Sequence, residues 1–157
     1  PLAFVYPCDE EAALSEDQLM VGSGMMIAPV YRQNARGRYV YLPEDMKLYR
    51  FRSCADADTE VLKAGHHFVR AELNEVLVFI RPDHVIPLSF GGRCVADVDM
   101  SKLRLMHFVR DEAVYELYDD DGYAKKIDVE AGITKVRVTA DGQVTVEGPL
   151  KAEWTLL

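Results

Sequence analysis

The chain has 157 residues, of which 49% are hydrophobic and 28% are charged, a composition typical of a globular protein with one domain or one domain and an appendage. Its formal net charge of −8 repels a phosphate backbone, which disfavours nucleic acid as a partner. No apolar run approaches the roughly 20 residues of a membrane-spanning helix, so we expect no membrane partner either.

Short β-forming segments separated by turn residues follow one another along the chain. In order, strands are predicted at residues 2–6, 25–31, 39–42, 47–52, 66–73, 76–80, 85–88, 103–109, 113–118, 133–139 and 144–147. Residues 15–18 fit a capping box, which predicts one helical turn before the second strand. Residues 34–38 and Asp141-Gly142 each predict a hairpin turn, the second with two residues. The expected fold is all-β, an antiparallel β-sandwich with one short helical turn near the N-terminus.

Gly91-Gly92 marks the expected boundary between two parts of the chain. Residues 1–90 are predicted to form a β-sandwich. Residues 91–157 are predicted to add β-hairpins that extend this sandwich or form a small distal β-unit. The predicted core consists of Phe4, Leu19, Met26, Ile27, Val30, Val40, Leu42, Phe51, Phe79, Ile80, Ile86 and Tyr115.

The first residues and the cysteines suggest where the chain comes from. It begins at Pro1 within an apolar run, without an initiator Met or a signal segment, so we expect a fragment of a longer protein. Cys8, Cys54 and Cys94 lie far apart and form no Cys-x-x-Cys pair, which indicates neither a disulfide framework nor a zinc ribbon. We expect buried free thiols in a reducing compartment.

Gly22-Ser23-Gly24 has the look of a phosphate-binding loop but lacks its context. The third glycine of a dinucleotide fingerprint and the Gly-Lys-Ser/Thr ending of a P-loop are both missing. A phosphate loop leads into a helix, and Pro29 would break a helix here. We therefore expect the glycines to bend the backbone sharply into a core strand, and we predict no cofactor.

Two acidic or histidine-rich stretches could suggest a metal. The run Asp119-Asp120-Asp121-Gly122 resembles a calcium loop, but it places Leu117 at the first ligand position and is more typical of a solvated turn. The histidines are His66, His67, His84 and His107. The first two are adjacent on a predicted strand and point to opposite faces, so they cannot easily share an ion. We predict no metal site.

The segment from Tyr31-Arg32 to Arg36-Gly37-Arg38-Tyr39 interleaves basic and aromatic side chains. It could bind an anion or a sugar, although a hairpin with solvated arginines is the simpler interpretation. The 26 acidic residues lie mostly in turns and on charged faces, and no Ser, Cys or His stands in a nucleophile-elbow context. We predict no catalytic residue in this chain.

Several separated motifs follow one another in a recognisable order along the chain. They are Pro1 to Pro7, Asp17-Gln18-Leu19-Met20-Val21-Gly22, Met26-Ile27-Ala28-Pro29-Val30, Tyr39-Val40-Tyr41-Leu42-Pro43, Leu48-Tyr49-Arg50-Phe51, Val78-Phe79-Ile80-Arg81, Val85-Ile86-Pro87-Leu88 and Tyr115 to Gly122. In this order they resemble the region after the catalytic barrel in glycoside hydrolase family 31, which includes α-glucosidases and α-xylosidases. Departures from the family pattern are Leu48 in place of a tryptophan, Leu77 in place of a proline, and Pro82-Asp83-His84 in place of a segment with glycine. They concern strand packing and one turn.

The resemblance implies an accessory role. In this family the nucleophile and the acid/base are aspartates on barrel loops, and no residue of this chain matches either. The chain is then expected to be a non-catalytic scaffold domain that packs on the barrel of a retaining, bacterial α-glucosidase-like enzyme, with an α-glucoside as the parent's substrate and the cytoplasm as its location. Removal of the barrel is expected to expose an apolar patch with Leu2, Phe4 and Tyr6, through which the chain could self-associate. The alternatives are a carbohydrate-binding module, for which the single Trp154 and eight tyrosines offer few platforms, and a protein-interaction sandwich unrelated to sugars.

Overall fold

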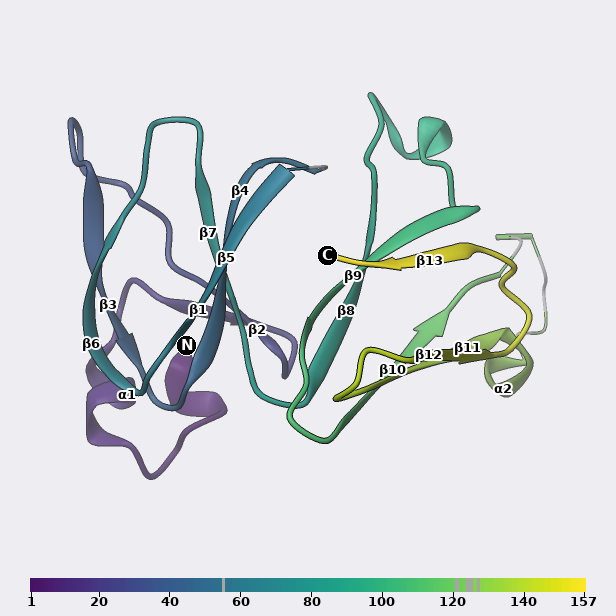
Figure 1. Cartoon of the computed structure of the whole chain (residues 1–157), viewed down its shortest axis with the longest axis horizontal. Helices are drawn as coiled ribbons and strands as arrows, with labels where there is room; N and C mark the ends of the chain where they lie inside the picture. Colours follow the sequence, from purple (N-terminus) through teal and green to yellow (C-terminus); the bar gives the residue numbers. More distant parts are fainter. Residues whose placement is uncertain (55, 121, 124–125, 127) are drawn as a thin grey trace. The chain divides into compact units, whose positions relative to one another are not determined.

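The structure is a computed structural model, and it describes residues 1–54, 56–120, 122–123, 126 and 128–157 (Figure 1). β-Strands dominate it, which confirms the all-β expectation. The chain divides into two compact units, an N-terminal unit, Pro1–Pro82, and a C-terminal unit, Asp83–Leu157. The predicted division into residues 1–90 and 91–157 stays a prediction. Within the described residues, no helix is both long and apolar enough to cross a bilayer.

The N-terminal unit consists of a five-stranded sheet, in the order β1-β2-β7-β4-β5, and a two-stranded sheet, β3-β6, with antiparallel pairing throughout. Its strands are β1 (Leu19–Val21), β2 (Met25–Ile27), β3 (Gly37–Leu42), β4 (Met46–Ser53), β5 (Asp56–Leu62), β6 (Gly65–Arg70) and β7 (Val76–Ile80). Side chains alternate along each strand, so Val40 and Leu42 of β3 join Met26, Leu48 and Phe79 in one buried core. This is sandwich packing, with Tyr39 and Tyr41 on the outer face of β3.

The N-terminus differs from the predicted strand and helical turn. Residues 2–6 do not form a strand; Leu2–Phe4 is a 3-10 helix, η1, in which the Leu2 carbonyl accepts from the N–H groups of Val5 and Tyr6. The first α-helix, α1 (Glu10–Leu14), begins after Asp9, whose side chain accepts from the Ala12 N–H. The helix therefore begins earlier than the turn predicted at residues 15–18, because the Asp9 side chain satisfies one of its free N–H groups. Residues 19–21 form strand β1 and not a helical turn.

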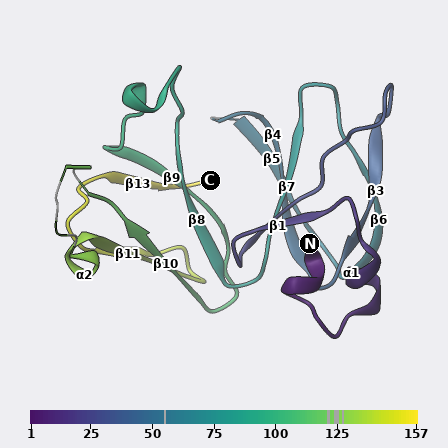
Figure 2. The ribbon, with the colours of Figure 1, turned by 180° about the vertical axis from the view of Figure 1, so that it is seen from behind.

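The predicted hairpin around residues 34–38 is wrong. β3 pairs with β6, with Tyr39 opposite Phe68, whereas β2 pairs with β1 and β7. Pro29 has no N–H for a sheet ladder, and the chain leaves the first sheet there and enters the second at Gly37. Figure 2 shows β3 and β6 side by side, as Figure 1 does. The strand β5 was not predicted, because it is acidic and lies at the sheet edge.

The C-terminal unit contains two three-stranded sheets, in the orders β13-β9-β8 and β10-β11-β12. Its strands are β8 (His84–Ser89), β9 (Lys102–Phe108), β10 (Glu112–Tyr118), β11 (Ile133–Thr139), β12 (Val144–Glu147) and β13 (Glu153–Leu156), with the short helices η2 (Val95–Asp97) and α2 (Val129–Gly132). The unpredicted β13 runs parallel to β9, an exception to the antiparallel pattern. Val85, Leu105, Ala113, Val136 and Val138 form the core of this unit.

The turn between β11 and β12 is a hairpin, as predicted, but it has three residues. The Thr139 N–H donates to the Gln143 carbonyl, which leaves residues 140–142 as the loop. Gly142 lies at φ 81, the left-handed conformation that such a loop requires at its last position. Gly142 therefore sets the loop length.

The predicted core is partly correct. Met26, Val40, Leu42, Phe79 and Ile80 are buried, and Ile27, Val30, Phe51, Ile86 and Tyr115 are half-buried. Phe4 and Leu19 are exposed, because neither lies on the strand or helical face that the sequence suggested. All three cysteines are free, but they are exposed and not buried as expected.

Candidate functional site

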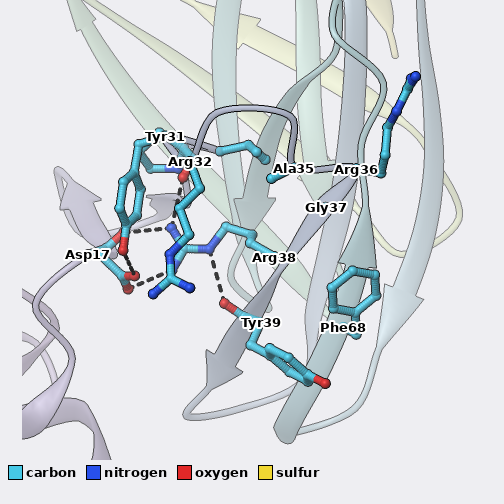
Figure 3. Close-up of a pocket in the computed structure, with 11 residues that line it drawn as sticks. Asp17, Tyr31, Arg32, Ala35, Arg36, Gly37, Arg38, Tyr39 and Phe68 are labelled. Atoms are coloured by element: carbon cyan, nitrogen blue, oxygen red, sulfur yellow. Dashed lines mark hydrogen bonds and ion pairs between the residues drawn. The ribbon is translucent and has the colours of Figure 1, made fainter.

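A pocket with a volume of about 370 Å³ lies in the N-terminal unit, between the segment that leads into β3 and the outer face of β6 (Figure 3). Its lining residues are Asp17, Pro29, Val30, Tyr31, Arg32, Ala35, Arg36, Gly37, Arg38, Tyr39 and Phe68. Its size falls within the range of ligand clefts, about 300–1,000 Å³. The basic-aromatic segment singled out in the sequence supplies most of its wall.

The local sequence determines how the segment enters β3. The Ala35 N–H donates to the Arg32 carbonyl, and Asn34 takes a positive φ of 61, which Asn tolerates better than most residues. Gly37 has φ 143, and a Cβ there would lie 2.3 Å from the Val69 carbonyl oxygen. Only glycine lets β3 start this close to β6.

Arg38 is the buried centre of the pocket wall, with 9% of its side chain exposed. Its guanidinium donates to the carbonyl oxygens of Asp17 and Pro29, both at 2.9 Å, and its Nη2 lies 2.5 Å from Asp17 Oδ1 (Figure 3). Its Nε donates to the Tyr39 carbonyl at 3.0 Å. The expected solvated arginine is therefore wrong here: Arg38 is a structural clamp, and each of its three side-chain nitrogens has a partner.

Asp17 is fixed as a carboxylate by the same contacts. Burial raises the pKa of Asp17, but the hydrogen bond and positive charge of Arg38, with a hydrogen bond from the Tyr31 hydroxyl at 3.1 Å, lower it by more, so the pKa lies below its ordinary value. A carboxyl in this state holds no proton to donate near neutral pH. Asp17 therefore positions Arg38 and Tyr31 and is unsuited to general acid catalysis.

Gln18, the next residue, ties the same segment to β3 and is buried. Its side-chain oxygen accepts from the Tyr41 N–H at 2.8 Å, and its Nε2 donates to the Tyr41 carbonyl at 2.7 Å. The amide thus replaces a neighbouring strand at this edge of β3. The Asp17-Gln18 and Tyr39-to-Pro43 motifs, separate in the sequence, are held together by these contacts.

The solvent side of the pocket is aromatic. Tyr39 and Phe68 face each other across β3 and β6, with ring centroids 5.2 Å apart and planes at 68°. They are 75% and 54% exposed, and Tyr31 is 62% exposed. The sequence did not point to Phe68, because only the pairing of β3 with β6 brings it to the pocket.

The two other arginines of the segment differ in their partners. Arg36 lies 3.1 Å from Glu72 in an exposed ion pair, and Figure 3 shows its side chain directed away from Tyr31 and Tyr39. Arg32 forms no ion pair or hydrogen bond through its side chain with any residue in the described part of the chain. Its guanidinium is therefore available as a hydrogen-bond donor in the pocket wall.

The glycines that suggested a phosphate loop form the turn between β1 and β2. Gly22 has φ 65, and Val21 pairs with Met25, the first residue of β2. A strand follows the loop where a phosphate site needs a helix N-terminus. The structure therefore agrees with the predicted bend into a core strand.

The metal candidates are not brought together. Asp121 lies outside the described residues, whereas Asp120 accepts hydrogen bonds from the Tyr118 hydroxyl and the Gly122 N–H. His66 Nε2 lies 3.7 Å from Glu11, and His67 Nε2 lies 2.7 Å from the Lys63 carbonyl. Within residues 1–54, 56–120, 122–123, 126 and 128–157, no three His, Cys, Asp or Glu side chains are placed to hold a metal ion.

Trp154 was considered above as a platform for a sugar. Its side chain is half-buried on β13 and packs against the core of the C-terminal unit. Its indole N–H has no hydrogen-bond partner among the described residues. The exposed aromatic rings of the pocket, and not Trp154, are therefore available to a ligand.

Comparison with known protein families identifies the family to which the N-terminal unit is similar. The model of the glycosyl hydrolase family 31 C-terminal domain matches residues 1–86. The chain belongs to glycosyl hydrolase family 31. This confirms the resemblance seen in the sequence motifs. The match spans the whole N-terminal unit, including both sides of the Asp17–Arg38 clamp.

Relatives in this family are much longer than the chain. Alpha-glucosidase 2 of Bacillus thermoamyloliquefaciens is 30% identical over an alignment of 171 positions. The alignment covers 99% of this chain and 20% of the relative. The GH31 dextranase of Flavobacterium johnsoniae, solved in complex with isomaltotriose, is 26% identical with a TM-score of 0.64 over 88% of this chain and 17% of its own. The GH31 α-xylosidase of Xanthomonas citri, 22% identical with a TM-score of 0.64 over 98% of this chain and 16% of its own, shares the fold.

Proposed function

We propose that the chain is a non-catalytic accessory domain of an α-glucosidase-type hydrolase, which supports a catalytic (β/α)8 barrel in the same polypeptide. The observation that carries this is the match of residues 1–86 to a family 31 C-terminal domain. The match to an α-glucosidase over only 20% of that protein supports a parent enzyme with further domains. The parent's substrate is then an α-glucoside, and its reaction a retaining hydrolysis.

The chemistry of the pocket supports an accessory role. Retaining glycosidases need two carboxyl groups about 5–5.5 Å apart, one of which must hold a proton. The carboxyl in the pocket wall, Asp17, is occupied by Arg38 and Tyr31 and has a lowered pKa. The pocket lining contains no second carboxylate.

Hydrolysis of p-nitrophenyl α-glucoside tests this proposal. The pure 157-residue chain is expected to release no p-nitrophenol above the buffer rate, whereas the parent enzyme, assayed alongside it, is expected to turn over. Turnover by the chain that a point substitution within it abolishes would contradict the proposal.

Self-association of the chain stays a prediction, but its expected surface needs correction. Leu2 is buried, and the Tyr6 hydroxyl donates to Glu44 at 2.6 Å, so only Phe4 of the three is a largely exposed side chain. The residues do not lie on one strand, because a 3-10 helix forms there. The apolar patch predicted from these residues is therefore absent.

A second candidate function is carbohydrate binding, which the accessory role does not exclude. The specific observation in its favour is the exposed aromatic pair of Tyr39 and Phe68 in the wall of a pocket that Arg32 also lines. The dextranase relative was solved with a bound isomaltotriose, so sugar ligands occur in proteins that contain this fold.

A further inference from the structure

We propose that Tyr39 and Phe68, on the outer face of β3 and β6, and Arg32, on the segment that leads into β3, form a binding site for a neutral oligosaccharide. The proposal rests on the second candidate function, carbohydrate binding, and names its residues and the class of its ligand. It also assigns to the chain a role beyond the support of a barrel. We call these three residues the aromatic corner. Tyr31 closes the pocket next to it.

The geometry of the two rings suits a pyranose. Their planes meet at 68°, so one ring can form a floor and the other a wall. A sugar ring has an apolar face of C–H groups, whose positive edges are attracted to the negative face of an aromatic ring. Tyr39, the more exposed of the two, is the better floor, and its hydroxyl adds a hydrogen-bonding group at the rim.

The corner is held in place before any ligand arrives. Tyr39 and Phe68 are opposite each other in a regular antiparallel ladder, and Phe68 packs over Gly37, where a Cβ would lie 3.1 Å from its ring. The Arg38 Nε also donates a hydrogen bond to the Tyr39 carbonyl, which helps to hold β3 in place. A ligand therefore does not have to order this backbone, which lowers the entropy cost of binding.

Arg32 gives the corner polarity without making it an anion site. Its planar guanidinium has five N–H donors, which suit the hydroxyl and ring oxygens of a sugar. The neighbouring cations are already engaged, Arg38 by Asp17 and Arg36 by Glu72. Among the described residues that line the pocket, Arg32 is the single basic side chain without an ion pair. On a chain with a net charge of −8, this favours a neutral ligand over a phosphorylated one.

A sugar also fits this surface better than a protein partner. A specific protein interface buries about 800 Å² per partner around a contiguous apolar centre. Here charged side chains, Arg32 and Arg36, lie on the segment next to the exposed rings. The polar His66 lies further along the same face of β6. The apolar area is thus confined to a few rings around a cleft, the usual composition of a small-ligand site.

Titration of the 157-residue chain with maltotetraose, isomaltotriose and cellotetraose, followed by ¹H–¹⁵N NMR, tests the proposal. We expect saturable shifts with at least one sugar, with a Kd on the order of 1 mM, confined to amides of residues 31–39 and 66–70. Shifts that map to another surface, or none at 20-fold the expected Kd, would overturn it, as would a response of these amides only to the separately produced barrel.

Substitutions locate the binding groups. Tyr39→Ala and Phe68→Ala are each expected to raise the Kd about tenfold, Arg32→Gln several-fold, and Tyr39→Phe little. Phe4→Ala, which removes an exposed ring outside the pocket in the same unit, is the matched control and should leave the Kd unchanged. Equal effects of test and control variants would refute the site.

This outcome is separable from that of the proposed function. A chain that binds no sugar and hydrolyses none would remove the aromatic corner and leave the accessory role intact. A chain that hydrolyses the glucoside would contradict the accessory role whatever its sugar affinity.

Discussion

Removal of the Arg38 guanidinium gives the sharpest test of how the pocket is built. Arg38→Met keeps most of the aliphatic side chain but deletes every N–H donor. The variant leaves the carbonyl oxygens of Asp17 and Pro29 without this donor and leaves the Asp17 carboxylate without its cation. The outward rings of Tyr39 and Phe68 are not touched directly, so the effect measures the clamp itself.

The expected loss is about 3 kcal/mol of unfolding free energy. Hydrogen bonds that involve a charged group contribute about 1.5–3 kcal/mol each, and Arg38 makes two such bonds to carbonyls, one part-buried and one exposed, so the lower end of this range applies. The Asp17 carboxylate is 42% exposed, so solvent screening limits the ion pair to about 1 kcal/mol and water replaces part of the lost contacts. The gain of an apolar Met side chain offsets a further part.

The pH dependence has a definite sign. The folded pKa of Asp17 lies below its ordinary value of 3.8, so the folded state holds this proton more weakly than the unfolded state does. The stabilisation is therefore fully present above about pH 4 and is lost as the pH falls through the folded pKa. The difference between wild type and Arg38→Met should be full at pH 7 and should shrink below pH 4.

Urea unfolding followed by NMR signals of Val40 and Phe79 reads the stability of the N-terminal unit, since the single Trp lies in the other unit. The matched control is Arg36→Met, whose ion pair is 78% and 67% exposed and should be worth less than about 0.5 kcal/mol. A loss below about 1 kcal/mol for Arg38→Met, or one equal to that of the control, would show that the clamp does not stabilise the unit.

Two further predictions concern the same unit. Gly37→Ala should destabilise it by about 2–4 kcal/mol in urea, because a Cβ would meet the Val69 carbonyl. Gly65→Ala, also at positive φ but with open space, should cost clearly less, and equal losses would contradict the clash. Burial and the hydrogen bond to Glu44 raise the pKa of Tyr6 above its ordinary 10.0, so stability should fall as the pH rises past 10. Tyr6→Phe should weaken that decline in urea titrations at pH 9 and 11, and an unchanged slope would argue against it.

The family 31 frame and the aromatic corner come from different residues of the same segment. Asp17, Gln18 and Arg38 fix the path of the chain with buried polar contacts. Tyr39 lies next to Arg38 but points outward, because successive side chains of a strand alternate between faces. A binding surface can therefore form on β3 without loss of the contacts that hold the strand in the sandwich.

The sequence alone determined the strand-forming segments, the all-β class, the glycine turn before Met25 and the family. These are local properties: alternation, β-branched and aromatic runs, and turn residues act over a few positions, and the family motifs are contiguous stretches. The same reasoning failed at residues 2–6 and 15–18, where short-range hydrogen bonds to Leu2 and the Asp9 cap decided the backbone.

The tertiary structure alone decided which strands pair. Every strand offers the same backbone donors and acceptors, so the local pattern cannot choose between a hairpin of β2 with β3 and the observed pairing of β3 with β6. That choice depends on burial of the whole core, and it alone brings Phe68 to Tyr39 and Asp17 to Arg38. The basic-aromatic segment was visible in the sequence, but whether each arginine is buried or free was set by contacts distant along the chain.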